Sequence, residues 1–300
     1  MTAVTAGSFK AGALNAAALA GDARRERAGL LLLTSPGMLI VLLLLFLPIG
    51  WLFWFSVIGE AGQLTAEHYT RIWTEGAYIE IFFATFRISF IVTAFCILLG
   101  YPVAYCLSQI STKWSGILLL AVLMPFWTSL LVRTYAWLVL LQRKGLINNW
   151  LTDLGLIDEP LKLVHNEAGT IVGMVHIMLP FLVLPLYAAM RSIDQTYLRA
   201  AANCGASPAK AFFQVFLPLS LPGLLAGTVL TFILCLGFYI TPAVLGGGRV
   251  QMIAQRIENS VHLFPTWGPA SALGVVLLLL TVGVLLLANW PLRRWRERLG

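Results

Sequence analysis

The chain alternates between long apolar runs and shorter polar segments. The apolar runs cover residues 30–58, 81–107, about 116–141, 168–190, 219–245 and 268–292. A helix needs about 20 apolar residues to cross the hydrocarbon core of a bilayer, and each run reaches that length. The pattern therefore predicts an all-α polytopic membrane protein with six transmembrane helices.

Prolines and glycines predict irregular points inside these helices. Pro180 and Pro185 should break the fourth helix, and the spacing of Gly223 and Gly227 favours a close helix contact in the fifth. Residues 237–248 combine a proline with three closing glycines and predict a broken helix. Such breaks occur in a bilayer where they line a cavity or are buried by protein, so this segment is the best candidate for a pathway wall. A simple exit turn would explain the glycines equally well.

The polar segments predict tails and loops. Residues 1–29 are rich in Ala, Gly and Thr, which predicts a mobile N-terminal tail, and residues 293–300 form a basic C-terminal tail. Segments 59–80 and 142–166 mix turn formers with apolar residues and predict loops with short helices on the bilayer surface. Residues 246–267 join the last two spans.

The composition supports this membrane assignment. Apolar residues make up 59% of the chain and charged residues only 11%, which lies outside the range of soluble proteins. The four cysteines fall in expected spans or in segment 191–218, so they suggest no disulfide framework. In a soluble protein the net charge of +7 would suggest nucleic-acid binding, but its distribution across the membrane explains it better.

The distribution of Lys and Arg predicts the orientation. Twelve of the 20 basic residues lie on the side of the two tails, Lys113 and segment 191–218, and six lie on the other side. Positively charged segments resist translocation, so both termini and segment 191–218 are expected in the cytoplasm.

Few polar groups fall within the expected spans, where a charge costs about 2.5 to 3.5 kcal/mol on insertion scales. Arg87 lies near the outer surface, and snorkelling of its side chain is favoured. Arg133 is either a group of the solute pathway or an arginine that snorkels or bonds to neighbouring carbonyls. His176 has no intramembrane acid to exchange a proton with, so we expect it to be satisfied inside the helix bundle.

The polar segment between the fourth and fifth spans has the composition of a docking element. Ala200 and Ala201 leave a flat helix face, and Gly205 supplies the left-handed residue that ends the helix. Ser207 and Pro208 then predict the N-cap and first residue of a second short helix, whose apolar side is formed by phenylalanines. The product is a helix-turn-helix elbow outside the bilayer.

The elbow resembles the loop of ABC importer permeases that runs Glu-Ala-Ala, three residues, Gly, nine residues and Ile-x-Leu-Pro. In that family the loop is a coupling helix that sits in a groove of a separate ATPase subunit. The resemblance implies an ATPase-coupling role for Arg199, Ala200, Ala201, Gly205, Val215, Leu217 and Pro218. Arg199 replaces the family's Glu, so a carboxylate that would pair with a basic group on the ATPase is absent. The alternative is an ordinary cytoplasmic connector that happens to contain alanine and glycine.

Further segments resemble permeases of the spermidine/putrescine type, and more closely the first of that system's two permease subunits. They are residues 101–105, 126–137, 145–148, 154–158, 179–187 and 237–242. The resemblance implies a type I importer permease domain of the MetI-like kind over residues 30–292, with the coupling loop at 191–218. It also implies a second permease subunit, two ATPase subunits and a periplasmic solute-binding protein, assembled in a bacterial inner membrane.

The source of energy follows from a missing motif. The chain contains no phosphate-binding Walker sequence, so ATP and Mg are expected on partner ATPase subunits, and this chain is expected to be non-catalytic with no cofactor or metal of its own. A self-sufficient secondary transporter is a competing hypothesis, but it should show paired intramembrane acids or two inverted halves. A scaffold without a solute path is another, and it leaves the elbow unexplained.

The nature of the solute is the most open question. The resemblance implies a polyamine, which carboxylates or aromatic faces would hold, and the expected spans contain no Asp or Glu. Arg133 would repel a cation, so opines, amino-acid derivatives and phosphonate-like compounds are alternatives, with selectivity mainly in the binding protein. The candidate pathway residues are Trp127, Arg133, Tyr135, Trp137, Tyr239 and Thr241.

Overall fold

The structure is a computed structural model that describes residues 4–59 and 61–299, with side chains described for residues 26, 29–59 and 61–288. The chain divides into two units, Met1–Trp54 and Phe55–Gly300. The basic residues predicted for the two tails are not among the residues whose side chains are described. Throughout the described ranges the regular structure is helical, apart from one isolated bridge between Ile58 and Leu64.

Helix α1 (Val4–Ser56) accounts for the described part of the first unit, and it contains Pro36 and Pro48. Residues 4–29, which we expected to form a mobile tail, are the first part of this helix. The stretch Gly29–Ser56 is long and apolar enough to cross a bilayer, and its most apolar window contains no buried residue. So many exposed apolar side chains require lipid or another protein chain around them.

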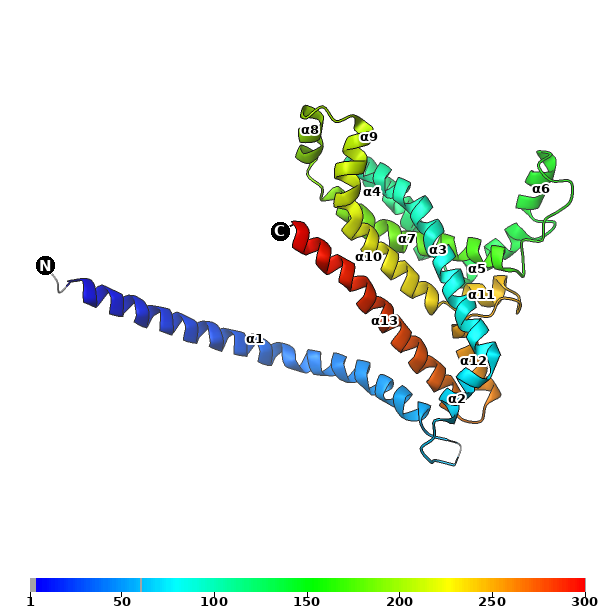
Figure 1. The fold of residues 1–300 in the computed structure, drawn as a ribbon, viewed down its shortest axis with the longest axis horizontal. Helices are drawn as coiled ribbons and strands as arrows, with labels where there is room; N and C mark the ends of the chain where they lie inside the picture. The colour runs from blue at the N-terminus through cyan, green and yellow to red at the C-terminus, as the bar shows by residue number, and fades with distance from the viewer. Residues whose placement is uncertain (1–3, 60, 300) are drawn as a thin grey trace. The chain divides into compact units, whose positions relative to one another are not determined.

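The second unit contains the remaining helices, shown in Figure 1. In chain order they are α2 (Glu67–Thr74), α3 (Gly76–Gln109), α4 (Thr112–Leu123), the 3₁₀ turn η1 (Met124–Trp127), α5 (Leu130–Leu141), α6 (Leu146–Asp153), α7 (Glu167–Arg191), α8 (Gln195–Asn203), α9 (Pro208–Ala211), the π-helical turn η2 (Phe212–Phe216), α10 (Leu217–Leu236), α11 (Ile240–Leu245), α12 (Ile253–Leu263) and α13 (Gly268–Leu299).

The lengths and composition of these helices confirm the predicted all-α membrane fold. Besides Gly29–Ser56, four stretches can each cross a membrane: Gly76–Gln109, Glu167–Arg191, Pro208–Leu236 and Gly268–Ala288. The segments Thr112–Trp127 and Leu130–Asp153 form a bent pair, which supplies the sixth predicted span when the two are counted as one.

The predicted third span is not one straight helix. α4 and η1 are separated from α5 by a bend of 95°. Pro125 lies at the start of η1 and lacks a backbone N–H, while Thr128 and Ser129 have extended ψ angles of 147° and 138°. The predicted third span up to about Leu141 is therefore present as two helical segments that meet at a bend.

The predicted break in the fourth span is also corrected, because α7 continues through Pro180 and Pro185. Each proline removes one backbone hydrogen bond to the preceding turn. α7 packs against both α3 and α10, and such neighbours allow a spanning helix to accommodate prolines without ending.

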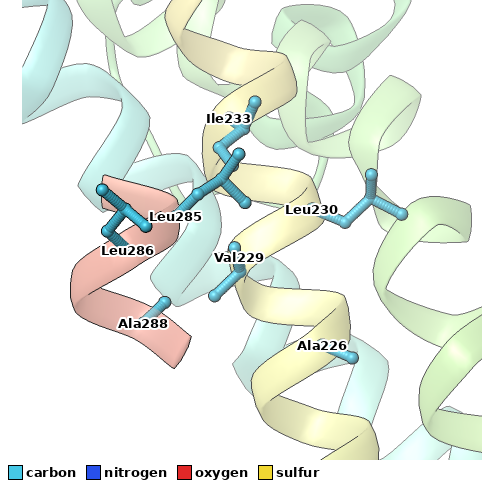
Figure 2. Close-up of a pocket in the computed structure, with 7 residues that line it drawn as sticks. All are labelled: Ala226, Val229, Leu230, Ile233, Leu285, Leu286 and Ala288. Carbon is cyan, nitrogen blue, oxygen red and sulfur yellow. The ribbon is translucent and has the colours of Figure 1, made fainter. Parts of the chain in front are cut away.

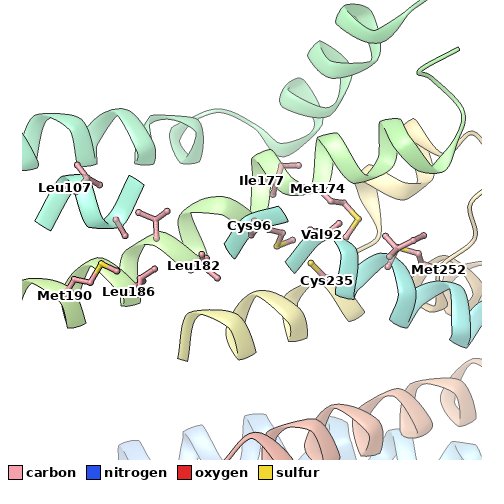
Figure 3. Close-up of a cluster of buried hydrophobic side chains, with 14 of the residues drawn as sticks. Val92, Cys96, Leu107, Met174, Ile177, Leu182, Leu186, Met190, Cys235 and Met252 are labelled. Atoms are coloured by element: carbon pink, nitrogen blue, oxygen red, sulfur yellow. The ribbon is translucent and has the colours of Figure 1, made fainter. Parts of the chain in front are cut away.

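The core of the second unit lies where α3, α7 and α10 meet. Figure 3 shows buried side chains from all three helices directed toward one another, among them Val92 and Cys96 of α3, Leu182 and Leu186 of α7, and Cys235 of α10. These side chains are all fully buried. The three helices therefore form the fixed frame on which the remaining elements are carried.

Close packing between α7 and α10 depends on two glycines. A Cβ at Gly227 would lie 2.9 Å from the carbonyl oxygen of Leu182, and a Cβ at Gly223 would overlap the Cβ of Ala189. The close helix contact predicted from the spacing of these glycines is thus confirmed, and its partner is α7.

The fifth span ends earlier than predicted. α10 stops at Leu236, and Gly237 caps it, so residues 240–245 form the separate helix α11. Gly247 and Gly248 then turn the chain with φ angles of +55° and +78°. The predicted break is confirmed, but α12 within the following loop was not foreseen.

Candidate functional site

The elbow begins with α8, a helix without a buried residue. The carboxylate of Asp194 accepts a hydrogen bond from the backbone N–H of Thr196 at 2.8 Å, which caps the helix start. This bond, helped by the charge of Arg199, holds the pKa of the Asp194 carboxyl below its usual range. Arg199 forms no ion pair among the described residues, so its guanidinium is free to meet a partner surface.

The end of α8 is a Schellman turn built on Gly205. Its φ is +79°, and the N–H of Gly205 donates to the carbonyl of Ala202 at 2.9 Å. The N–H of Ala206 donates to the carbonyl of Ala201 at 3.0 Å, which completes the pattern. The left-handed role predicted for Gly205 is confirmed.

The second half of the elbow differs from the prediction of a separate short helix. The Ser207 hydroxyl accepts a bond from the N–H of Lys210, and Pro208 is the first helical residue, as expected. The helix then runs on through the π-helical turn η2 into α10, so Pro208–Leu236 forms one apolar stretch. The elbow is therefore continuous with the fifth span on this side.

Aromatic rings form the contact between the elbow and α3. Tyr105 of α3 meets Phe212 and Phe216 edge-on, with ring centroids 5.2 and 5.1 Å apart. Phe216 is almost fully buried. The sequence showed the phenylalanines of the elbow, but nothing in the spacing indicated that Tyr105, about 110 residues earlier, would lie beneath them.

The motif residues divide into two groups. Arg199, Ala200 and Gly205 are exposed and Ala201 is half-buried, so the first part of the motif forms a surface. Val215, Leu217 and Pro218 are half-buried in η2 and the first turn of α10. The first group can contact a partner, whereas the second group sets how the elbow joins the fifth span.

The candidate pathway residues lie on η1, α5 and the break that leads into α11. α5 packs against α11, where the hydroxyls of Thr134 and Thr241 are 3.3 Å apart. Thr241 is completely buried, whereas Trp127, Tyr135 and Tyr239 are exposed. The structure thus brings the two predicted pathway segments together, and it leaves three aromatic side chains accessible.

Arg133 faces the ring of Phe126, with its guanidinium carbon 5.8 Å from the ring centroid. Its Nε is buried without a hydrogen-bond partner, and none of the ion pairs among the described residues includes it. Trp137 donates its indole N–H to Nδ1 of His176 at 3.1 Å, which confirms that His176 is satisfied inside the bundle.

The side chain of Arg87 is partly exposed, as expected near the outer surface, but the sequence did not indicate its partner. It forms an ion pair with Glu167, the first residue of α7. Both side chains are partly exposed, so the pair lies at the edge of the bundle and links α3 to the start of α7.

Replacing Glu167 by glutamine is expected to destabilise the protein by no more than about 1 kcal/mol, because partly exposed pairs gain little in water. Thermal unfolding of the purified protein in detergent measures this effect. The difference from the wild type should shrink at high salt, since screening weakens the pair. A loss that is unchanged by salt would contradict an electrostatic link.

The cavities of the second unit are mainly apolar. One cavity, of about 430 Å³, lies between α10 and α13 and is lined only by aliphatic side chains, as Figure 2 shows. It offers no group that would bind a polar solute. Within the described part of the chain, no three His, Cys, Asp or Glu side chains are grouped to hold a metal ion.

A bundle of spanning helices that carries an exposed, glycine-closed elbow between two of its spans is the architecture of a membrane permease subunit. The comparisons with known proteins identify the family. Residues 26–297 match the binding-protein-dependent transport system inner membrane component, and the chain belongs to that family.

Named relatives and solved structures agree with this membership. The chain is 36% identical over 237 residues to the spermidine/putrescine transport system permease protein PotB of Haemophilus influenzae, covering 78% of this chain and 82% of that protein. It is 33% identical over 230 residues to PotB of Escherichia coli, covering 77% and 83%. It is 32% identical over 198 residues to the inner membrane ABC transporter permease protein YdcU of Escherichia coli, covering 61% and 62%.

The fold is that of ABC importer permeases. A chain of a bacterial transporter involved in the import of alginate superposes with a TM-score of 0.70 at 17% identity, covering 92% of this chain and 98% of that chain. A chain of the MetNI methionine transporter gives a TM-score of 0.54 at 16% identity, covering 72% and 95%. The predicted MetI-like fold is confirmed.

Proposed function

We propose that this permease forms half of the solute pathway of an ABC importer, paired with a second permease subunit, and that its elbow docks on one of two ATPase subunits. The observation that carries the proposal is the exposed surface of Ala200 and Gly205, held in place by the Schellman turn at the end of α8. Small residues there allow close approach of another protein surface. ATP and Mg would be bound by the ATPase subunits, and hydrolysis would occur there.

A periplasmic binding protein would deliver the solute on the opposite side. Support comes from the family description and from a structural neighbour solved in complex with a solute-bound periplasmic protein. In this arrangement both termini and the elbow are cytoplasmic, in agreement with the excess of Lys and Arg on that side.

Cysteine labelling tests this orientation. Cys204, at the end of α8, and Cys106, in the last turn of α3, are exposed, whereas Cys96 and Cys235 are buried, so the test uses a Cys106→Ser background. A membrane-impermeant maleimide is expected to leave Cys204 unmodified in intact spheroplasts and to modify it in inside-out vesicles. A Leu154→Cys variant, at an exposed position of the loop before α7 and with Cys106 and Cys204 replaced by serine, should show the reverse pattern. Labelling of Cys204 from the outside would refute the proposed orientation and the docking role with it.

The solute is proposed to be a polyamine such as spermidine or putrescine. The two PotB relatives carry that name, and exposed Trp127, Tyr135 and Tyr239 offer aromatic faces that attract an ammonium group. The carboxylates that a polyamine also requires would come from the second permease subunit, because the described spans of this chain offer none near the pathway residues.

One observation favours a second candidate. Arg133, which lacks an acidic partner among the described residues, would attract an anion, so a solute that carries a carboxylate or phosphonate beside its amine is the alternative.

Uptake competition distinguishes the two candidates. The complete transporter, with its binding protein, is reconstituted in liposomes and takes up labelled spermidine. Unlabelled putrescine is expected to reduce uptake strongly, whereas an opine or an aminophosphonate should have no effect. Competition by the anionic compounds without competition by putrescine would overturn the polyamine proposal and leave the permease role intact.

A further inference from the structure

Arg191, the last residue of α7, joins three elements at the base of the elbow. Its Nη1 donates to the backbone carbonyls of Ser108 at 3.0 Å and Ile110 at 3.1 Å. Its Nη2 donates to the hydroxyl of Thr112, the first residue of α4, at 2.6 Å. One side chain thus holds the end of α3 and the start of α4 against the end of α7.

These bonds have a clear physical basis. The last carbonyls of a helix have no partner within it, and a cation near them also interacts favourably with the helix dipole. Ser108 lies in the last turn of α3, and Ile110 is its C-cap. A planar guanidinium presents donors on separate nitrogens in a fixed geometry, so it can bond two carbonyls and a hydroxyl at once, whereas a lysine would have to make all three bonds from a single nitrogen.

A second polar link lies one turn away. The hydroxyl of Ser115 in α4 donates to the hydroxyl of Tyr187 in α7 at 2.7 Å. Tyr187 and Arg191 are four residues apart on α7, and Thr112 and Ser115 are three apart on α4, so each pair lies on one helix face. Two polar links along matching faces fix α4 to the end of α7 in position and direction.

Arg191 also occupies a particular place along the chain. Only residues 192–194 separate it from α8, the exposed helix of the elbow. In the other direction α4 runs into η1 and the 95° bend, beyond which α5 carries Arg133 and Tyr135. The hydrogen bonds of Arg191 therefore connect the elbow with the element that leads to the broken third span.

We propose that Arg191 is a positioning residue that transmits movement of the elbow to α4 and so to the broken third span. This inference rests on the proposed coupling role of the elbow. The elbow is already joined to α10 through η2 and to α3 through Tyr105. Arg191 adds a link to α4, which leads directly into the bend. Without it, docking would still occur, but α4 would be held to the end of α7 only by the bond between Ser115 and Tyr187, and the third span would follow the elbow less closely.

The test compares Arg191→Gln, Arg191→Lys and a control, Lys113→Gln, in the complete transporter with its ATPase subunits and binding protein. Lys113 is the neighbour of Thr112, is exposed, and its side chain forms no hydrogen bond or ion pair with any of the described residues. Three quantities are measured: the ATPase that co-purifies, the rate of ATP hydrolysis with loaded binding protein, and the labelled spermidine transported per ATP.

Arg191→Gln is expected to retain the ATPase in wild-type amount and to hydrolyse ATP, while spermidine transported per ATP falls about tenfold. Arg191→Lys should recover part of that ratio, because it keeps the charge but loses the multiple bonds. Lys113→Gln should match the wild type. Thr112→Val, which removes one hydroxyl acceptor only, should lower the ratio by a smaller factor and serves as the milder variant if Arg191→Gln does not assemble.

Two results would overturn the inference. One is an unchanged transport ratio in every variant of Arg191 and Thr112 that retains the ATPase. The other is loss of the ATPase from both Arg191→Gln and Thr112→Val, which would make Arg191 part of docking or assembly instead. Failure of the wild-type chain to retain any ATPase would instead refute the proposed function, so the two failures are distinguishable.

Discussion

Replacing Gly205 by proline is expected to abolish solute uptake and the ATP hydrolysis that the binding protein stimulates, with the chain still inserted in the membrane. Gly205 has a φ of +79°, whereas proline fixes φ near −65°. Proline also lacks the N–H that bonds to the carbonyl of Ala202. The end of α8 would therefore unwind, and the surface that includes Ala200 would lose its position. Co-purification of the ATPase and uptake in liposomes measure the effect.

The chain provides a matched control for this substitution. α6 ends in the same kind of turn, with φ of +67° at Gly155, a bond from its N–H to Thr152 at 2.9 Å and one from Leu156 to Leu151 at 2.9 Å. Gly155→Pro introduces the same backbone conflict in the loop before α7, away from the elbow. It should leave ATPase co-purification unchanged. Equal retention of the ATPase by Gly205→Pro would contradict the docking role of the elbow.

Alanine at Gly205 tests the conformational part of the argument alone. No atom lies within 4 Å of the position that its Cβ would occupy, so only the left-handed backbone opposes it. That conformation costs a non-glycine residue roughly 1–2 kcal/mol. We therefore expect reduced uptake with retained docking, intermediate between the wild type and Gly205→Pro.

Replacing Gly223 by valine is expected to destabilise the packing of α7 against α10 by about 1–3 kcal/mol, because the helices cannot separate without opening the core. The new side chain would overlap Ala189 and approach the carbonyl oxygen of Pro185, which a Cβ alone would reach at 3.2 Å. The thermal unfolding temperature of the purified protein in detergent should fall accordingly.

Gly283 of α13 is the control for this second substitution, because it lies inside a spanning helix and no atom is within 4 Å of a Cβ there. Gly283→Val introduces the same β-branched side chain without the overlap. It should leave the unfolding temperature close to that of the wild type. Equal losses in the two variants would show that helix propensity, and not the contact with α7, explains the effect of Gly223→Val.

Local sequence features correctly predicted those parts of the elbow that depend on the conformational preferences of single residues. The left-handed turn at Gly205 and the cap at Ser207 both follow from properties of single residues. The prediction of a separate second helix was wrong because Phe212–Phe216 form a π-helical turn that merges with α10. A single π-helical turn does not change the hydrophobic periodicity enough to be recognised in the sequence.

In contrast, the sequence did not predict the partners of the polar groups in and near the spans. Arg87 pairs with Glu167, 80 residues away, and Arg191 bonds to the end of α3, more than 75 residues away. Such partners are set by which helices become neighbours, and the sequence of one helix does not contain that information. Proline was equally ambiguous: Pro125 ends a helix, whereas Pro180 and Pro185 lie within one that is packed on both sides.

The sequence by itself determined the class of the molecule, the places where helices cross the membrane and the turn that closes the elbow. These depend on apolar length and on the conformational limits of individual residues, which act locally. Only the tertiary structure decided the continuity of α7 and the partners of Arg87 and Arg191. Those features depend on whether a neighbouring helix supplies a hydrogen-bond acceptor, a carboxylate or a surface to pack against, which residues distant in the chain provide.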